Sequence, residues 1–155
     1  MNAKRLLKLA DFLDKLPPNR FDFSHWVGDD WGGAQDLSCG TTACAIGWCP
    51  TIPAFRRLGL RIVKVDGFPA VAFKGQQRRT LTGNAITERA AMRLFDLTQE
   101  EVEFLFLPST ACQCAACVRL MTSSDSKIGL GATPKRVARH IREFVQRGGL
   151  PTERS

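Results

Sequence analysis

Tyrosine is absent from this chain of 155 residues, and histidine occurs only twice. Without tyrosine, and with Phe and Trp at positions that favour burial, the sequence shows no row of aromatic side chains on which nucleic-acid bases would stack. His25 and His140 are the only imidazole groups. Sites that need three or more histidines are therefore excluded.

Long apolar runs are also absent, since no stretch approaches the roughly 18 apolar residues of a membrane-spanning helix. Lys4 and Arg5 precede leucines as in a signal peptide, but Lys8 and Asp11 interrupt the apolar segment and no small-residue cleavage site follows. We therefore expect a cytoplasmic protein with no membrane contact. Its six cysteines are then expected to be reduced, as packed thiols, metal ligands or a nucleophile.

The short motifs of several large enzyme classes are missing as well. The sequence contains no phosphate-binding loop, no G-x-G-x-x-G fingerprint, no H-E-x-x-H and no G-x-S-x-G. Nucleotide-dependent, zinc-protease and serine-hydrolase chemistry therefore has no support in the sequence.

The composition is that of a globular protein, with 44% hydrophobic and 24% charged residues. The length suits one domain of common size. We expect a single globular domain over residues 1–149, followed by a flexible C-terminal tail at 150–155.

Positive charge dominates and is unevenly spread. The net charge is +7, and the basic residues gather in the segments 56–79 and 133–148, which favours polyanions or acidic protein surfaces as partners. The alternative is that these side chains simply solvate exposed faces. The candidate contacts to phosphates are Arg78, Arg79, Arg136, Arg139 and Arg142.

Most of the chain shows the apolar spacing of amphipathic helices, with start and stop signals at their ends. Thr98 and Glu101 form a capping box, and Thr133-Pro134 with Gly148-Gly149 bound the last helix. The predicted helices cover Ala3–Leu16, Cys39–Trp48, Thr51–Leu58, Asn84–Leu97, a segment from Thr98 to before Pro108, Thr110–Met121 and Thr133–Gly148.

The segment Leu60–Lys74 has a different pattern, with β-branched residues on both sides of Asp66-Gly67. This dipeptide is a strong signal for a hairpin turn. A third strand at Arg79–Leu81 is an alternative extension. Together these patterns predict a mainly α, α+β fold: a single core of about five or six helices with a small antiparallel β-hairpin.

Two segments also resemble a known group of proteins. Phe21 to Trp26, and then the run Cys39-Gly40-Thr41-Thr42-Ala43-Cys44-Ala45-Ile46-Gly47-Trp48, resemble an uncharacterised family of small bacterial and bacteriophage proteins. That family carries an F-x-x-x-W segment followed by C-G-T-x-x-C-x-x-G; here Phe21 and Trp26 lie one residue further apart. The resemblance covers about residues 5 to 60 and implies a class of origin, but no activity.

Cys39 is the candidate catalytic residue. A cysteine at the start of a helix lies near the positive end of the helix dipole, which favours the thiolate. Its base would be His25 or His140, and Gln35 would help to hold an oxyanion. The alternative is that Cys39 is a small apolar residue at a tight turn.

Cys112, Cys114 and Cys117 are the candidate metal ligands, because a C-x-C-x-x-C run can place thiolates on one zinc ion. A fourth ligand would come from another cysteine or a histidine. The alternative is close packing of small residues in an alanine-rich helix. We therefore expect no cofactor, with zinc as the alternative.

Trp31 stands among glycines and aspartates, where an aromatic side chain often anchors a contact with another protein. The alternative is that Trp31 folds back onto the predicted helix that begins at Cys39. The leading hypothesis is a small, cytoplasmic, non-enzymatic binding or accessory protein that docks on a host protein or nucleoprotein. The alternatives are a cysteine-nucleophile hydrolase using Cys39, and a nucleic-acid-binding protein with a basic helical face. The oligomeric state stays open.

Overall fold

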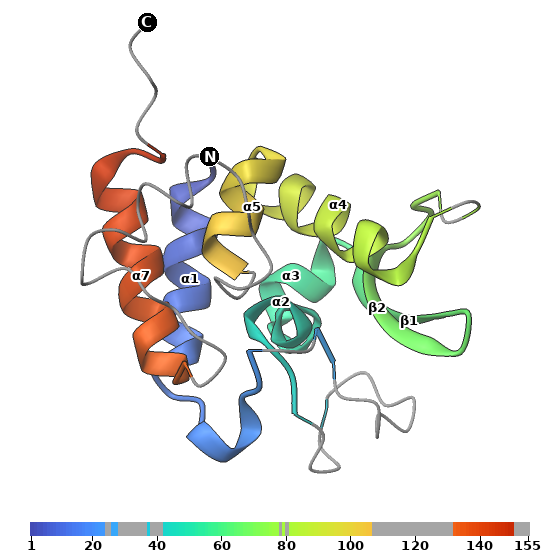
Figure 1. Ribbon diagram of the computed structural model, residues 1–155, viewed down its shortest axis with the longest axis horizontal. Coiled ribbons are helices and arrows are strands. Elements are labelled where there is room, and N and C mark those ends of the chain that lie inside the picture. The colour runs from blue at the N-terminus through green and yellow to red at the C-terminus, as the bar shows by residue number, and fades with distance from the viewer. Residues whose placement is uncertain are drawn as a thin grey trace, which may run out of the picture.

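The computed structural model describes residues 1–23, 26–27, 37, 42–77, 79, 81–106 and 132–150 (Figure 1). Its α-helices are α1 (Ala3–Leu13), α2 (Ala45–Trp48), α3 (Pro53–Arg57), α4 (Gly83–Phe95), α5 (Gln99–Phe106) and α7 (Pro134–Arg147). Its strands are β1 (Leu60–Val65) and β2 (Phe68–Phe73), and short 3-10 turns cover Pro18–Arg20 and Cys49–Thr51. The predicted fold class, mainly α with one hairpin, is confirmed.

Helices α1 and α7 lie side by side and run in opposite directions, although they come from the two ends of the described chain (Figure 1). Each presents an apolar stripe to the core, as its sequence spacing predicts. The buried residues of these stripes are Leu6, Leu9, Ala10 and Leu13 on α1, and Val137, Ala138, Ile141 and Phe144 on α7.

Helix α1 ends at Leu13, three residues before the predicted end at Leu16. Pro17 disfavours helical geometry at the residue before it, so the helix stops ahead of the proline. Leu16 is nevertheless buried. The apolar spacing therefore predicts burial correctly but overestimates the length of the helix.

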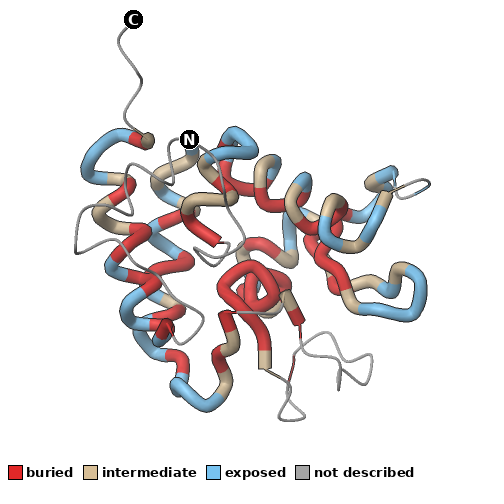
Figure 2. The backbone as a smooth tube through the Cα atoms, viewed as in Figure 1, coloured by how far each residue is buried: buried red, intermediate tan, exposed pale blue. Residues whose placement is uncertain are grey.

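Helix α2 lies at the centre of the molecule, and all four of its residues are buried (Figure 2). It begins at Ala45 because Cys44 has extended backbone, with φ −76° and ψ −178°. Among the described residues, only the last four of the predicted helix 39–48 are therefore helical. Helix α3, which begins at Pro53, matches the expected short helix.

The hairpin is formed as predicted, with Val65 paired to Phe68 across the turn. Asp66 and Gly67 have positive φ angles of 50° and 86°, the geometry of the two-residue turn that asparagine or aspartate followed by glycine favours. The sheet has two strands within the described residues, so the alternative third strand at Arg79–Leu81 is not formed there.

The predicted helix caps are also present. The Glu101 N–H donates to Thr98 Oγ1 at 3.3 Å, and the Thr98 N–H donates to Glu101 Oε2 at 2.9 Å, which completes the capping box. In α7, Thr133 Oγ1 accepts from the Arg136 N–H, and Gly148 ends the helix with φ +78°. Helix α4 begins at Gly83 behind a Thr82 cap, one residue before the prediction.

The hydrophobic core has two parts. The large cluster joins all six described α-helices, α4 included, and one face of the hairpin. A small second cluster contains Ala70, Ala72 and Ile86, between the other hairpin face and the start of α4. Leu150, which the sequence assigns to the tail, is half-buried against the large cluster.

Two further predictions concern residues that the structure does not describe. The predicted helix 110–121 and the tail residues 151–155 lie outside the described ranges. None of the helices within those ranges is both long and apolar enough to cross a membrane.

Candidate functional site

The segment around Gly47 is packed so closely that only glycine fits. A Cβ atom added there would lie 1.6 Å from the Trp26 carbonyl oxygen and 2.7 Å from the Ala43 Cβ. Gly47 is the last glycine of the C-G-T-x-x-C-x-x-G pattern. Its place in the pattern therefore has a structural cause, which is the approach of the Trp26 backbone to α2.

Phe21, Asp22 and Val27 are held against Ala43 by backbone contacts. Phe21 and Val27 each form a β-bridge with Ala43, and the Asp22 N–H donates to the Ala43 carbonyl at 3.1 Å. The Trp26 indole N–H donates to Asn84 Oδ1 at 3.0 Å, so Trp26 is half-buried and links this segment to α4. Trp48, at the end of α2, is buried, as its position in the sequence favours.

Arg20 completes this packing. Its guanidinium group lies 5.1 Å from the centre of the Trp48 ring and donates to the Leu37 carbonyl. In return, the Trp48 indole N–H donates to the Arg20 carbonyl at 3.0 Å. The described residues of the segments 21–26 and 39–48 therefore hold one another in position.

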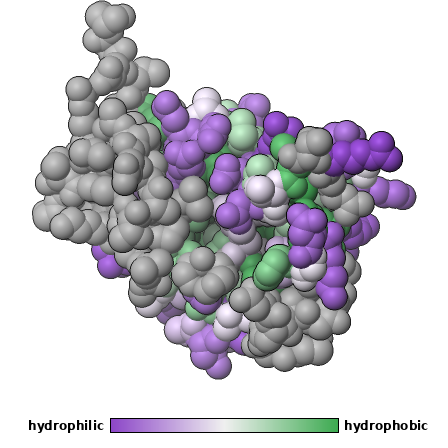
Figure 3. Space-filling view, turned by 45° about the vertical axis from the view of Figure 1, so that its right-hand side comes forward, coloured by the Kyte–Doolittle hydropathy of each residue, from purple (hydrophilic) through white to green (hydrophobic). Residues whose placement is uncertain are grey.

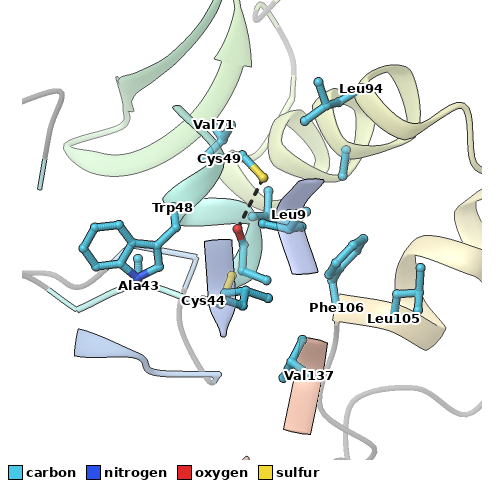
Figure 4. Packing of buried hydrophobic residues seen from close by; sticks show 14 of the residues in the cluster. Leu9, Ala43, Cys44, Trp48, Cys49, Val71, Leu94, Leu105, Phe106 and Val137 are labelled. Carbon is cyan, nitrogen blue, oxygen red and sulfur yellow. Dashed lines mark hydrogen bonds between the residues drawn. The ribbon is translucent and has the colours of Figure 1, made fainter. Parts of the chain in front are cut away.

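The two described thiols are buried and face the core (Figure 4). Burial raises the pKa of Cys44 to about 12 and also raises the pKa of Cys49, whose Sγ donates to the Ala45 carbonyl at 3.3 Å. Because the thiolate is the form that attacks substrates and binds metals, neither residue suits such chemistry at neutral pH.

His140 is 9% exposed and packs between α5 and α7. Its ring centre lies 4.6 Å from that of Phe104. Burial lowers the pKa of His140, while a hydrogen bond to the Phe104 backbone and the charge of Glu143 act in the opposite direction. This position suits a neutral packing residue better than a general base that must reach a substrate.

Several predicted site residues lie outside the described residues, and their roles stay predictions. These are the catalytic candidates Cys39 and His25, the metal candidates Cys112, Cys114 and Cys117, and the binding candidates Trp31 and Arg78. Within the part of the chain that the structure describes, no group of three or more His, Cys, Asp or Glu side chains is placed to hold a metal ion.

Helix α7 places Lys135, Arg136 and Arg139 on its exposed face, as its sequence pattern predicts. Arg142 is different, because it is tied to the neighbouring helix. Its Nη2 lies 2.8 Å from Asp11 Oδ1 and 2.6 Å from Asp14 Oδ2. These carboxylates occupy the guanidinium group, so Arg142 joins α7 to α1 and is a poorer candidate for phosphate contact.

Arg79 is exposed in the loop between β2 and α4. This loop and the hairpin lie on one side of the molecule, and α7 lies on the opposite side (Figure 1). The sequence suggests that the two basic segments act together on one polyanion. The structure instead separates Arg79 from the cations of α7, so they form two surfaces.

No family model, curated protein or solved structure matches this chain. The resemblance to small bacterial and bacteriophage proteins thus gains no support from these comparisons and stays a prediction.

One exposed feature escapes the sequence analysis. Phe68 is 64% exposed at the end of the hairpin, the largest exposed fraction among the large hydrophobic residues described. The signal in the sequence is its position directly after the Asp66-Gly67 turn, where a side chain extends beyond the elements that cover the strands.

Proposed function

We propose that this protein is a non-enzymatic binding protein that docks on a partner protein or nucleoprotein. The observation that carries the proposal is a contrast in exposure. The described thiols and the described imidazole are buried, with pKa values displaced against reactivity. The arginine and lysine side chains, in contrast, reach solvent on two sides of the molecule.

The first cationic surface is the outer face of α7, where Lys135, Arg136 and Arg139 are exposed. Residues three and four positions apart on a helix lie next to each other, so their charges act on the same region of solvent. Apart from His140, the side chains that this helix buries are apolar. The cations are thus held on a rigid element, which suits a surface that attracts and orients an acidic partner.

The second cationic surface is the hairpin side, where Arg57, Lys74, Arg79 and Arg89 are exposed. The acidic residues gather elsewhere, notably Glu100 and Glu101 in the first turn of α5. Such segregation of charge within one small molecule raises the rate of encounter with acidic partners and disfavours basic ones.

Partner capture from a bacterial lysate tests the proposal. The immobilised chain is expected to enrich a defined partner over beads that carry an unrelated protein of equal net charge. Reversing the charges of α7 with Lys135→Glu, Arg136→Glu and Arg139→Glu should lower the retained amount by about tenfold at low salt. The variant with Arg136→Lys and Arg139→Lys keeps the charges and serves as the control.

Nuclease treatment of the lysate separates the two kinds of partner. A protein partner remains on the beads after nuclease, while a nucleoprotein contact made through nucleic acid is lost. Enrichment of nothing beyond the basic control protein overturns the proposal. Rapid labelling of Cys39 by iodoacetamide at neutral pH, well before the other thiols, would instead favour the hydrolase.

A further inference from the structure

The β1–β2 hairpin projects from the helical body and leaves apolar side chains uncovered near its tip (Figures 1 and 3). Val65 is paired with Phe68, and Val63 with Ala70. Since paired residues and residues two positions apart share one face of a sheet, Val63, Val65 and Phe68 lie on the same face.

This face is covered only over part of its length. Ile86 of α4 packs on Ala70 and Ala72, while Val63, Val65 and Leu81 are half-buried at the border of this cluster. Phe68 lies beyond them and is mostly exposed. We name Val63, Val65, Phe68 and Leu81 the hairpin strip. It is apolar surface that the chain itself leaves open.

The surroundings of the hairpin strip are cationic. Arg61 lies on the same face of β1, Arg79 is in the loop next to Leu81, and Arg89 is exposed on α4. From residue 60 to residue 95, the only acidic residues are Asp66 and Glu88. Burial and the nearby Glu103 raise the pKa of Glu88.

The outer edge of β2 does not offer free backbone donors to which a strand of another protein could pair. Pro69 has no N–H, the Val71 N–H donates to Thr87 Oγ1 at 3.0 Å, and the Phe73 N–H donates to Gln76 Oε1 at 3.0 Å. An incoming strand would find no free donor at these positions of the edge. Contact along the edge of β2 must accordingly be made by side chains.

We propose that the hairpin strip docks an acidic, amphipathic segment of a partner protein. The apolar residues of that segment cover Phe68 and its neighbours, and its carboxylates meet Arg79 and Arg89. Arg61 contributes positive charge nearby, but its Nη1 already donates to the Arg56 and Leu60 carbonyls at 2.8 and 2.7 Å. This inference rests on the proposed binding function and adds a contact site on the hairpin side, separate from the cationic face of α7, together with the chemistry of the partner segment that meets it.

The apolar content of the hairpin strip favours a protein over a nucleic acid. Single-stranded nucleic acids stack on successive aromatic side chains, whereas here one phenylalanine stands among valines and a leucine. An exposed aromatic residue surrounded by aliphatic groups and cations is the composition of a contact point between proteins.

Fluorescence anisotropy with designed probes tests the inference. The probe is a labelled peptide of about fifteen residues that places Glu on one helical face and Leu and Phe on the other. We compare it with the same peptide carrying Ser in place of Leu and Phe, and with a single-stranded oligonucleotide of equal charge. The full chain should bind the acidic apolar peptide saturably and bind both comparison probes about tenfold more weakly.

Two matched pairs of variants test where on the protein the peptide binds. Phe68→Ser should weaken peptide binding about tenfold, whereas Leu58→Ser, which removes an exposed leucine at 45% exposure away from the tip, should change it less than about twofold. Arg79→Glu should weaken binding several-fold, and Arg139→Glu on α7 should not. Because all of these side chains are exposed, thermal unfolding should confirm that the variants fold normally.

The outcomes separate this inference from the proposed function. Absence of saturable peptide binding, equal losses in Phe68→Ser and Leu58→Ser, or tighter binding of the oligonucleotide overturns the inference. Equal binding of the Ser-containing peptide also overturns it, because charge alone then explains the contact. If a lysate partner is still captured normally by Phe68→Ser, the proposed function stands and the hairpin strip is not its contact site.

Discussion

The helical side and the hairpin side of this protein are stabilised in different ways. On the helical side, α1, α5 and α7 bury large side chains such as Leu9, Phe106 and Phe144 in one continuous cluster. On the hairpin side, the contact between the outer face of the hairpin and α4 is made by Ala70, Ala72 and Ile86. The first region depends on buried area, at about 1.5–3 kcal/mol for each large side chain.

The second region depends on close approach and on specific hydrogen bonds. Alanines on β2 let α4 come near enough for Thr87 to accept a hydrogen bond from the strand, while its hydroxyl donates to the Gly83 carbonyl at 2.9 Å. Small residues cover little area, so the ends of the strands remain open. The comparison teaches that large buried side chains stabilise the helices and the inner face of the hairpin, while the outer face of the hairpin keeps apolar surface available.

The largest expected effect comes from Gly47→Ala. Its Cβ would collide with the Trp26 carbonyl at 1.6 Å, so the backbone of one segment must move. We expect a loss of about 3 kcal/mol or more in the free energy of unfolding, measured by urea denaturation. Gly83→Ala is the matched control on the hairpin side, because its Cβ would lie at an ordinary 3.6 Å from Ala70. Equal losses for both would remove the contrast.

Thr87→Val tests the hydrogen bonds of the hairpin side. The valine has nearly the same shape but leaves the buried Val71 N–H without its acceptor, so we expect a loss of about 1–3 kcal/mol. Amide exchange at Val71 should accelerate more than exchange in α1. Thr51→Val, where the hydroxyl donates to the Trp48 carbonyl at the surface of the large cluster, should cost less. If Thr87→Val leaves the free energy of unfolding unchanged, the packing of Ala70 and Ala72 stabilises this side without the hydrogen bond.

Arg142→Gln tests the ion pairs that join α7 to α1. Pairs at the protein surface contribute up to about 1 kcal/mol, so the expected destabilisation is of that order and shrinks in high salt. Arg139→Gln, on the exposed face of the same helix, should change stability by less than about 0.5 kcal/mol. A double variant with Asp14→Asn should lose little beyond Arg142→Gln alone.

The smallest effect is the pH dependence from His140. Burial lowers the pKa of His140 in the folded state below its ordinary value of 6.5, so below pH 6.5 the unfolded chain takes up a proton more readily. The stabilisation is present above pH 6.5 and is lost as the pH falls below it. The Tm of the natural chain should therefore drop between pH 7 and pH 5 by more than that of His140→Leu. An identical slope in both would assign the pH dependence to other groups.

Much of the fold follows from local signals in the sequence. The Asp66-Gly67 turn, the Thr98 capping box and the Thr133-Pro134 start each place backbone donors or turn geometry within a few residues, and each is found as predicted. The errors have two causes. Helix α1 stops at Leu13 because Pro17 disfavours helical geometry just ahead of it, although Leu16 stays buried. The segment before Ala45 is extended because it pairs with the more distant residues Phe21 and Val27.

The candidate site was less accessible to sequence reasoning. The exposure of Arg136 and Arg139 follows from the apolar spacing of α7. The ion pairs of Arg142 with Asp11 and Asp14 do not follow from this spacing, because these partners are more than 120 residues away in the sequence. The exposure of Phe68 does not follow from the sequence either, since it depends on where α4 stops covering the hairpin.

The pairing of α1 with α7 also has a consequence for synthesis on the ribosome. Helix α1 is made first, and its packing partner α7 is made about 130 residues later. At about 5–20 residues per second, Leu6, Leu9 and Leu13 wait on the order of ten seconds before α7 emerges to cover them. During that interval the nascent chain presents a leucine-rich helix that a chaperone can hold, and the packing of α7 on α1 must then close a loop of roughly 120 residues.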